Sequence, residues 1–107
     1  VLCLDAIDDQ EERRMVTDTI RHSGKEVLEI SEVQKHQFGG NMLLVKGGGD
    51  ALHLVMSTSA FNCLTTEQKA LIEGYHNILH TDLTTIETLG GGSARCMLAE
   101  IYLPKQP

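Results

Sequence analysis

Short apolar runs and polar segments alternate along the chain, and the spacing within each segment predicts a strand or a helix. The chain opens with an apolar run over residues 1–7, which is typical of a central strand. Asp8 and Asp9 follow as helix N-cap candidates, and Gly24 is placed to end that helix in a left-handed conformation. Residues 26–30 then alternate as a strand should. The opening segment therefore predicts a strand, a helix and a strand in turn.

Two further helices are predicted from one repeated capping pattern. Ser31 and Gln34 have the spacing of a capping box, so a short helix is expected over residues 32–36. Thr65 and Gln68 repeat the pattern ahead of a second helix that reaches about residue 75. In a capping box the side chain of each residue accepts a hydrogen bond from the backbone amide of the other, so this pair of residues marks the start of a helix.

Strand-length apolar runs flank a glycine-rich turn in the middle of the chain. Residues 42–45 and 51–56 are these runs, and residues 47–50, Gly-Gly-Gly-Asp, form the turn between them. The rest of the second half is predicted as a helical turn, a strand, a loop and a last strand, over residues 58–64, 78–83, 84–89 and 97–103.

The two halves of the chain carry the same order of elements, which indicates an internal repeat. The approximate units are residues 1–50 and 51–107, each with a strand, helix, strand, glycine-rich turn and strand. The period is about 55 residues. When the two halves are aligned with this offset, Asn41 of the first half lies opposite Cys96 of the second in the alignment.

A repeat of this size predicts a propeller-like or ring-like array of small units. Two units alone would leave sheet edges exposed, which is a liability for pairing with other chains. The chain also begins inside a predicted strand, without an initiator Met. We therefore expect residues 1–107 to be the C-terminal part of a single domain, with further units upstream. A chance similarity between two α/β hairpins is the alternative.

Composition and charge narrow the classes of function. The 107 residues, 41% hydrophobic and 22% charged, suit one globular domain. The formal net charge of -6, from 9 Lys+Arg against 15 Asp+Glu, argues against a nucleic-acid partner. No apolar run has the length of a membrane span and no signal-peptide pattern opens the chain, so no membrane partner is expected.

Cysteine and histidine usage predicts no disulfide framework, no metal site and no cofactor. Cys3, Cys63 and Cys96 are odd in number and far apart, a pattern that fits a reducing, cytoplasmic compartment. The histidines form no HExxH-type cluster with a carboxylate at ligand spacing. Cys3 and Cys63 have apolar neighbours and are expected to be buried structural thiols.

The stretch with the strongest chemical signal is residues 90–96, Gly-Gly-Gly-Ser-Ala-Arg-Cys. Glycines allow a sharp backbone bend and leave room for a ligand. Cys96 is a candidate nucleophile at the start of the next predicted strand. Arg95 beside it would either favour the reactive thiolate or contact a carboxylate of the substrate. The alternatives are an ordinary buried thiol for Cys96 and a surface or salt-bridged side chain for Arg95.

Other residues near this stretch have weaker signals. Gly91, Gly92 and Ser93 are expected to shape the loop around the thiol. Asn41 is either a hydrogen-bonding group at the rim of the site or a residue that tolerates a left-handed turn. Glu87 is expected to be a solvated loop charge.

Three segments resemble a known enzyme superfamily. Residues 85–87, Thr-Ile-Glu, and 89–100, Leu-Gly-Gly-Gly-Ser-Ala-Arg-Cys-Met-Leu-Ala-Glu, resemble the C-terminal signature of the guanidino-group modifying enzymes. These include arginine deiminase, dimethylarginine dimethylaminohydrolase and the amidinotransferases, and the closest resemblance is to the citrulline utilisation hydrolase branch. Residues 38–43, Phe-Gly-Gly-Asn-Met-Leu, resemble an Asn-containing turn one repeat earlier. The resemblance implies an α/β fold of the pentein type, a propeller of five ββαβ units, with about the last two supplied here.

The resemblance also implies a mechanism. The cysteine matching Cys96 attacks the central carbon of a guanidinium or ureido group, and an amine or ammonia leaves. Water or an acceptor amine then resolves the covalent intermediate. A histidine acts as general acid and base, and carboxylates hold the substrate nitrogens. The histidine motif of the family lies upstream of these units, so none of the five histidines here is assigned that role.

These inferences favour a cytoplasmic hydrolase of non-peptide C–N bonds, with citrulline or a related guanidino or ureido amino acid as substrate. An amidinotransferase, an arginine deiminase-like enzyme and a non-catalytic pentein that binds a partner are the alternatives. The expected partners are the small-molecule substrate and the upstream units of the same protein, with a homo-oligomer left open.

Overall fold

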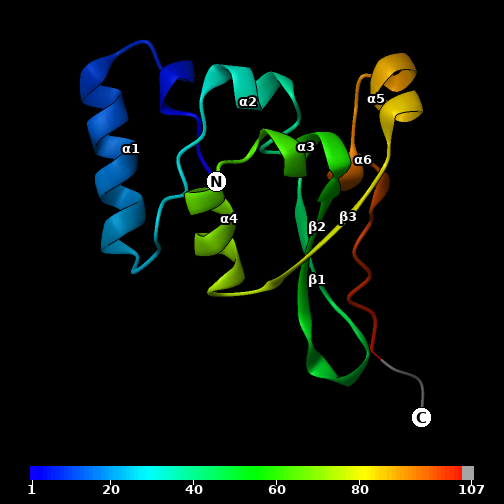
Figure 1. The fold of residues 1–107 in the computed structure, drawn as a ribbon. Helices are drawn as coiled ribbons and strands as arrows, with labels where there is room; N and C mark the ends of the chain where they lie inside the picture. The colour runs from blue at the N-terminus through cyan, green and yellow to red at the C-terminus, as the bar shows by residue number, and fades with distance from the viewer. Residues whose placement is uncertain (105–107) are drawn as a thin grey trace.

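The central feature of the molecule is a three-stranded mixed sheet of order β1-β2-β3 (Figure 1). The computed structural model describes residues 1–104. β1 (Leu43–Lys46) pairs antiparallel with β2 (Leu52–Ser57), and β3 (Asn77–Thr81) pairs parallel with β2. Parallel strands need a crossover connection, and α3 (Thr58–Cys63) and α4 (Thr66–Glu73) supply it. This part of the α/β fold therefore runs strand, strand, helix, helix, strand.

A smaller parallel connection precedes the sheet. Leu2 forms an isolated parallel bridge with Glu29, and α1 (Gln10–His22) lies between these two residues along the chain. The Leu2 amide donates to the carbonyl of Leu28 at 2.8 Å, and the Ile30 amide donates to the carbonyl of Leu2 at 2.9 Å. Two parallel connections through helices thus follow one another, which is consistent with the predicted repeat of element order.

Three of the helices begin at capping residues that the sequence predicted. Asp9 caps α1 by accepting from two backbone amides of the first turn, at 2.8 and 2.9 Å. Gly24 has a φ of 76°, the left-handed conformation expected after this helix. Complete capping boxes begin α2 (Glu32–His36) at Ser31 and α4 at Thr65. These helix starts, together with the hairpin turn between β1 and β2, are confirmed.

The two capping boxes are joined to each other through their glutamines. The Gln34 Nε2 group donates to Gln68 Oε1 at 2.7 Å, and Gln68 Nε2 donates to Gln34 Oε1 at 3.2 Å. The same two amide groups donate to the backbone carbonyls of Cys63 and Glu29, each at 2.7 Å. This reciprocal pair fixes the start of α2 against the start of α4, and so connects the two halves of the chain.

A single aliphatic core is shared by both halves. Met56 and Ala60 are completely buried. The buried cluster consists of Leu28, Ile30, Met42, Met56, Ala60, Leu64 and Ile72. Because its members come from both halves, neither half buries its apolar side chains without the other.

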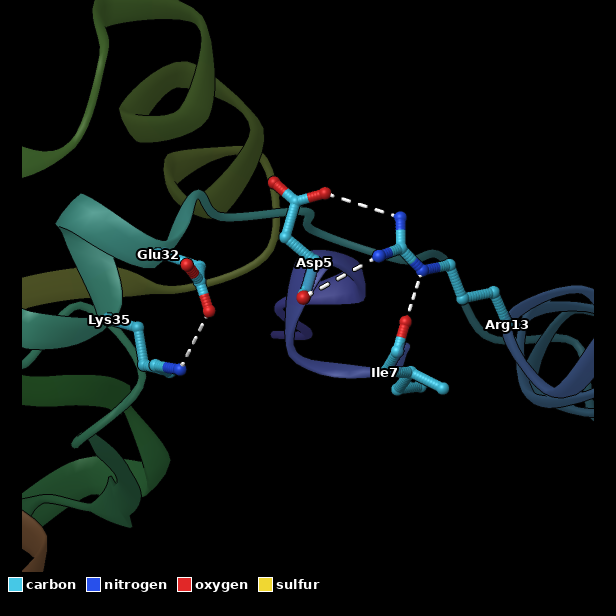
Figure 2. A network of polar contacts seen from close by, with 5 residues as sticks. All are labelled: Asp5, Ile7, Arg13, Glu32 and Lys35. Atoms are coloured by element: carbon cyan, nitrogen blue, oxygen red, sulfur yellow. Dashed lines mark hydrogen bonds and ion pairs between the residues drawn. The ribbon is translucent and has the colours of Figure 1, made fainter. Parts of the chain in front are cut away.

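Exposed ion pairs lie at the two N-terminal helices (Figure 2). The Arg13 guanidinium of α1 pairs with Asp5 at 3.3 Å and donates to the carbonyl of Ile7. On α2, Lys35 pairs with Glu32 at 3.4 Å. Exposed pairs of this kind contribute little to the free energy of folding, so the fold does not depend on them.

Two predicted strands near the N-terminus are wrong. Residues 1–7 pair only at Leu2, and Leu4–Ala6 form one turn of 3-10 helix. The strand expected over residues 26–30 is likewise reduced to the bridge at Glu29. Residues with strand propensity form a strand only where a partner extends the ladder of hydrogen bonds, and here the ladder stops after one bridge.

The loop predicted over residues 84–89 is also wrong, because this segment forms α5 (Thr84–Gly90). Asp82 accepts from the backbone amide of Thr84 at 2.9 Å and so supplies a hydrogen-bond partner at the helix start. Threonine and isoleucine have low helix propensity, which favoured a loop in the sequence. Tertiary contacts of Glu87, described below, outweigh that local preference.

The last strand, predicted over residues 97–103, is not formed. Ala94–Met97 instead form the short helix α6, and residues 98–104 are irregular. As at the N-terminus, an apolar run without a paired neighbour does not become a strand. The division into units 1–50 and 51–107 remains a prediction, and the β1–β2 hairpin crosses the boundary between them.

Removal of the glutamine pair tests its role in stability. We expect Gln68→Ala to lower the free energy of unfolding by about 2 kcal/mol, because the Gln34 amide and the Glu29 carbonyl lose their partner. Urea denaturation followed by circular dichroism measures this loss. Gln10→Ala, at an exposed position of α1, is the matched control and should change stability by less than about 0.5 kcal/mol. Equal stability of the two variants would contradict the prediction.

Candidate active site

Cys96 lies on α6, directly after the glycine-rich stretch, and its side chain is exposed. The expectation that it stands at the start of a strand is therefore wrong. Ser93 is the N-cap residue of this short helix. One helical turn, rather than a strand end, presents the sulfur to solvent.

Asn41 bonds both the sulfur and the backbone beside it. Its Nδ2 group donates to Cys96 Sγ at 3.1 Å, and its Oδ1 atom accepts from the backbone amide of Arg95 at 2.8 Å. The repeat predicted that Asn41 and Cys96 are equivalent positions, and the fold brings them into contact. Of the two alternatives for Asn41, the structure shows the hydrogen-bonding one, since the left-handed residue of this turn is Phe38, with φ 63°.

These contacts favour the ionised form of the thiol. The pKa of Cys96 lies below its ordinary value, first because the Asn41 amide donates to the sulfur and second because the Ser93 backbone amide does so. The charge of Arg95 acts in the predicted direction and is the smallest of the contributions. Neutral donors therefore do most to stabilise a thiolate here, and the thiolate is the nucleophilic form of cysteine.

Two glycines before the thiol have different roles. Gly91 has a φ of 68° and ends α5 in the left-handed conformation that glycine adopts without strain. At Gly92 a Cβ atom would stand 3.1 Å from Cys96 Cβ and 3.3 Å from its sulfur. Gly91 is thus required by backbone conformation, and Gly92 by the space that the Cys96 side chain occupies.

Glu87 is not the solvated loop charge that was expected. It lies half-buried on α5, where its carboxylate accepts from Ser93 Oγ at 2.6 Å and from Ser59 Oγ at 2.8 Å. Burial pushes the pKa of Glu87 upward, but hydrogen bonds from the hydroxyls of Ser57, Ser93 and Ser59 outweigh it and hold the pKa below its ordinary value. Sequence analysis missed this residue because two of its serine partners lie far upstream, at the start of α3.

A hollow opens on the Asn41 side of the site. Its volume is about 330 Å³, and its lining residues are Lys35, Phe38, Gly40, Asn41 and Arg95. Two of these residues are cationic and one is aromatic. Lys35 was not singled out from the sequence, because nothing local distinguishes it from any other lysine on an exposed helix.

The three cysteines, all within the described residues, have different environments. Cys96 is exposed, whereas Cys3 and Cys63 are partly buried. Burial raises the pKa of the Cys63 thiol, the opposite direction from Cys96. Cys96 therefore combines exposure to solvent with a lowered pKa, two properties that are expected of a nucleophile.

Residues 1–104 contain no cluster of three or more His, Cys, Asp and Glu side chains arranged to hold a metal ion. Over the same residues, every helix is too short or too polar to cross a membrane.

One comparison with known proteins gives a match. The sequence model of a family described as N,N dimethylarginine dimethylhydrolase, eukaryotic, matches residues 1–103. No curated protein and no solved structure matches the chain. The matched range contains Asn41, Glu87 and Cys96, the residues around which the site is built.

The bond from Asn41 to the sulfur can be tested on the thiol itself. We expect Asn41→Ala to raise the pKa of Cys96, because the donor that contributes most to the thiolate is removed. The rate of alkylation by iodoacetamide, followed by mass spectrometry of the Cys96 peptide from pH 5 to 10, measures this change. Asn62→Ala, at an exposed position of α3, is the matched control. A midpoint for Asn41→Ala that equals that of the control would contradict the assignment.

Proposed function

Because the chain belongs to the eukaryotic N,N dimethylarginine dimethylhydrolase family, we propose that it hydrolyses the guanidino C–N bond of an N-methylated arginine with Cys96 as nucleophile. The observation that carries the proposal is the contact from Asn41 Nδ2 to Cys96 Sγ at 3.1 Å, on an exposed thiol of lowered pKa. Such a sulfur is suited to attack a carbon that resonance makes unreactive toward water.

The reaction proceeds in two steps. The Cys96 thiolate adds to the central carbon of the guanidinium, forming a C–S bond. The C–N bond to the methylated nitrogen breaks, and that nitrogen leaves as an amine after taking up a proton. Water then adds to the same carbon, the C–S bond breaks, and citrulline and the free thiolate are released. The proton donor is a general acid for which no histidine of this chain is proposed.

The hollow beside Asn41 is suited to the amino-acid end of the substrate. Lys35 and Arg95 are among its lining residues and are cationic, and a cation of either kind pairs with a carboxylate. In this proposal Arg95 has the substrate-binding role expected from the sequence. Gly92 leaves the sulfur free to approach the substrate carbon, because a side chain at this position would crowd the thiol.

The resemblance seen in the sequence also supports a second substrate class. Residues 89–100 resemble most closely the citrulline utilisation branch, so a citrulline-type ureido substrate is the second candidate. Hydrolysis of citrulline would release ammonia, whereas hydrolysis of dimethylarginine releases dimethylamine. The two products distinguish the candidates directly.

The substrate and the nucleophile can be tested together. We expect the full-length protein to release dimethylamine from asymmetric dimethylarginine, and Cys96→Ala to reduce the rate by at least about 10³-fold, because no covalent intermediate can form. Amine and ammonia release, measured with dimethylarginine, arginine, citrulline and agmatine, defines the substrate. Cys63→Ala, which removes a partly buried thiol, is the matched control and should keep most of the activity.

The outcomes of this experiment separate the alternatives. Release of ammonia from citrulline, with no release from the other compounds, would change the proposed substrate and keep Cys96 as the proposed nucleophile. Equal release from arginine and agmatine would contradict the proposed role of Lys35 and Arg95, because agmatine lacks the carboxylate. No release from any substrate, with Cys96 slow to alkylate at neutral pH, would favour a non-catalytic binding protein.

A further inference from the structure

A hydrogen-bonded carboxylate connects the thiol loop to the start of a helix in the middle of the chain. Glu87 Oε1 accepts from Ser93 Oγ at 2.6 Å, and Glu87 Oε2 accepts from Ser59 Oγ at 2.8 Å. Ser93 is completely buried, and so is Ser57, whose hydroxyl helps to lower the pKa of Glu87. Hydroxyl donors of this kind compensate a carboxylate for the water it loses on burial.

The same serine begins the helix that carries the sulfur. Ser93 is the N-cap residue of α6, on which Cys96 lies, and its hydroxyl donates to Glu87. Gly91 and Gly92, which precede it, have no side chains that could anchor the loop. The Ser93 hydroxyl is therefore the first side chain after the glycines that fixes this turn to the rest of the protein.

We propose that Glu87 is a positioning residue for Cys96: by anchoring Ser93, it holds the start of α6 and keeps the sulfur within hydrogen-bond distance of the Asn41 amide. The inference rests on the proposed role of Cys96 as nucleophile. Glu87 acts through Ser93 and does not contact the reacting atoms. The Ser59 hydroxyl, in the first turn of α3, bonds the other oxygen of the carboxylate, so the position of the turn is set by the helix that follows β2.

A direct effect of charge would have the opposite sign, which makes the proposal testable. A carboxylate near the thiol disfavours the thiolate, so removing its charge alone would favour ionisation. Loss of positioning removes a hydrogen bond to the thiolate and disfavours ionisation. The direction in which the alkylation profile moves therefore distinguishes the two effects, and a purely structural bond would leave the profile in place.

The experiment measures alkylation of Cys96 by iodoacetamide from pH 5 to 10 in wild type, Glu87→Ala and Glu87→Gln. We expect the midpoint of Glu87→Ala to move to higher pH, with a rate at pH 7 about threefold lower, because loss of thiolate exceeds the gain in its intrinsic nucleophilicity. Above the midpoint the variant should react at least as fast as wild type, so the two profiles cross. Glu87→Gln keeps an oxygen acceptor and should restore most of the wild-type profile.

Two further variants separate positioning from loss of folding. Ser93→Ala removes the same hydrogen bond and should move the midpoint in the same direction as Glu87→Ala. Glu73→Ala, at an exposed position at the end of α4, is the matched control and should not move it. Circular dichroism checks that each variant is folded. If Glu87→Ala does not fold, the alkylation midpoint of Ser93→Ala tests the positioning role in its place.

The results that overturn the inference are distinct from those that overturn the proposed function. An unmoved midpoint in both Glu87→Ala and Ser93→Ala, or a midpoint moved to lower pH, would reject the positioning role while leaving Cys96 as nucleophile. A wild-type Cys96 that titrates as an ordinary thiol, together with no amine release, would reject the nucleophile itself.

Discussion

The arrangement of this molecule depends on two glutamine side chains that bond to each other. Gln34 and Gln68 each complete a capping box and then share their remaining hydrogen bonds across the interface between the two halves. A partly buried amide has two donors and one oxygen to satisfy, and here every group has a partner. The pair fixes α2 relative to α4, and α2 leads directly into the turn that carries Asn41. The position of the Asn41 amide at the sulfur therefore depends on how α2 and α4 are held together at their first residues.

The sulfur is the end of a chain of polar contacts that begins at the sheet. β2 leads into α3, whose first residues supply hydroxyls to Glu87. Glu87 bonds Ser93, which begins the helix that carries Cys96. Asn41 reaches the sulfur from the first half. A neutral donor therefore does most to lower the pKa of this exposed thiol, and its ionisation depends less on the nearby arginine than its place in the sequence suggested.

Local signals in the sequence were sufficient for three of the helix starts. A capping box involves residues three apart, so it can be recognised without knowledge of the fold, and both boxes formed as predicted. The predicted repeat aligned Asn41 with Cys96, but the hydrogen bond between them is a feature of the fold that the alignment did not specify. Strands at the N-terminus and over residues 97–103 failed, because pairing depends on a neighbour that no local pattern specifies. Glu87 was missed for the same reason, since its partners on α3 come from a distant segment.

The contact between Asn41 and Cys96 also has a consequence for the order of folding. The two residues are 55 positions apart along the chain, so their hydrogen bond forms only after the segment between them has folded and closed. Before that closure, the cysteine is an ordinary thiol in a flexible chain. The unfolded polypeptide therefore lacks the Asn41 donor at this thiol, and the lowered pKa of Cys96 is a property of the folded chain.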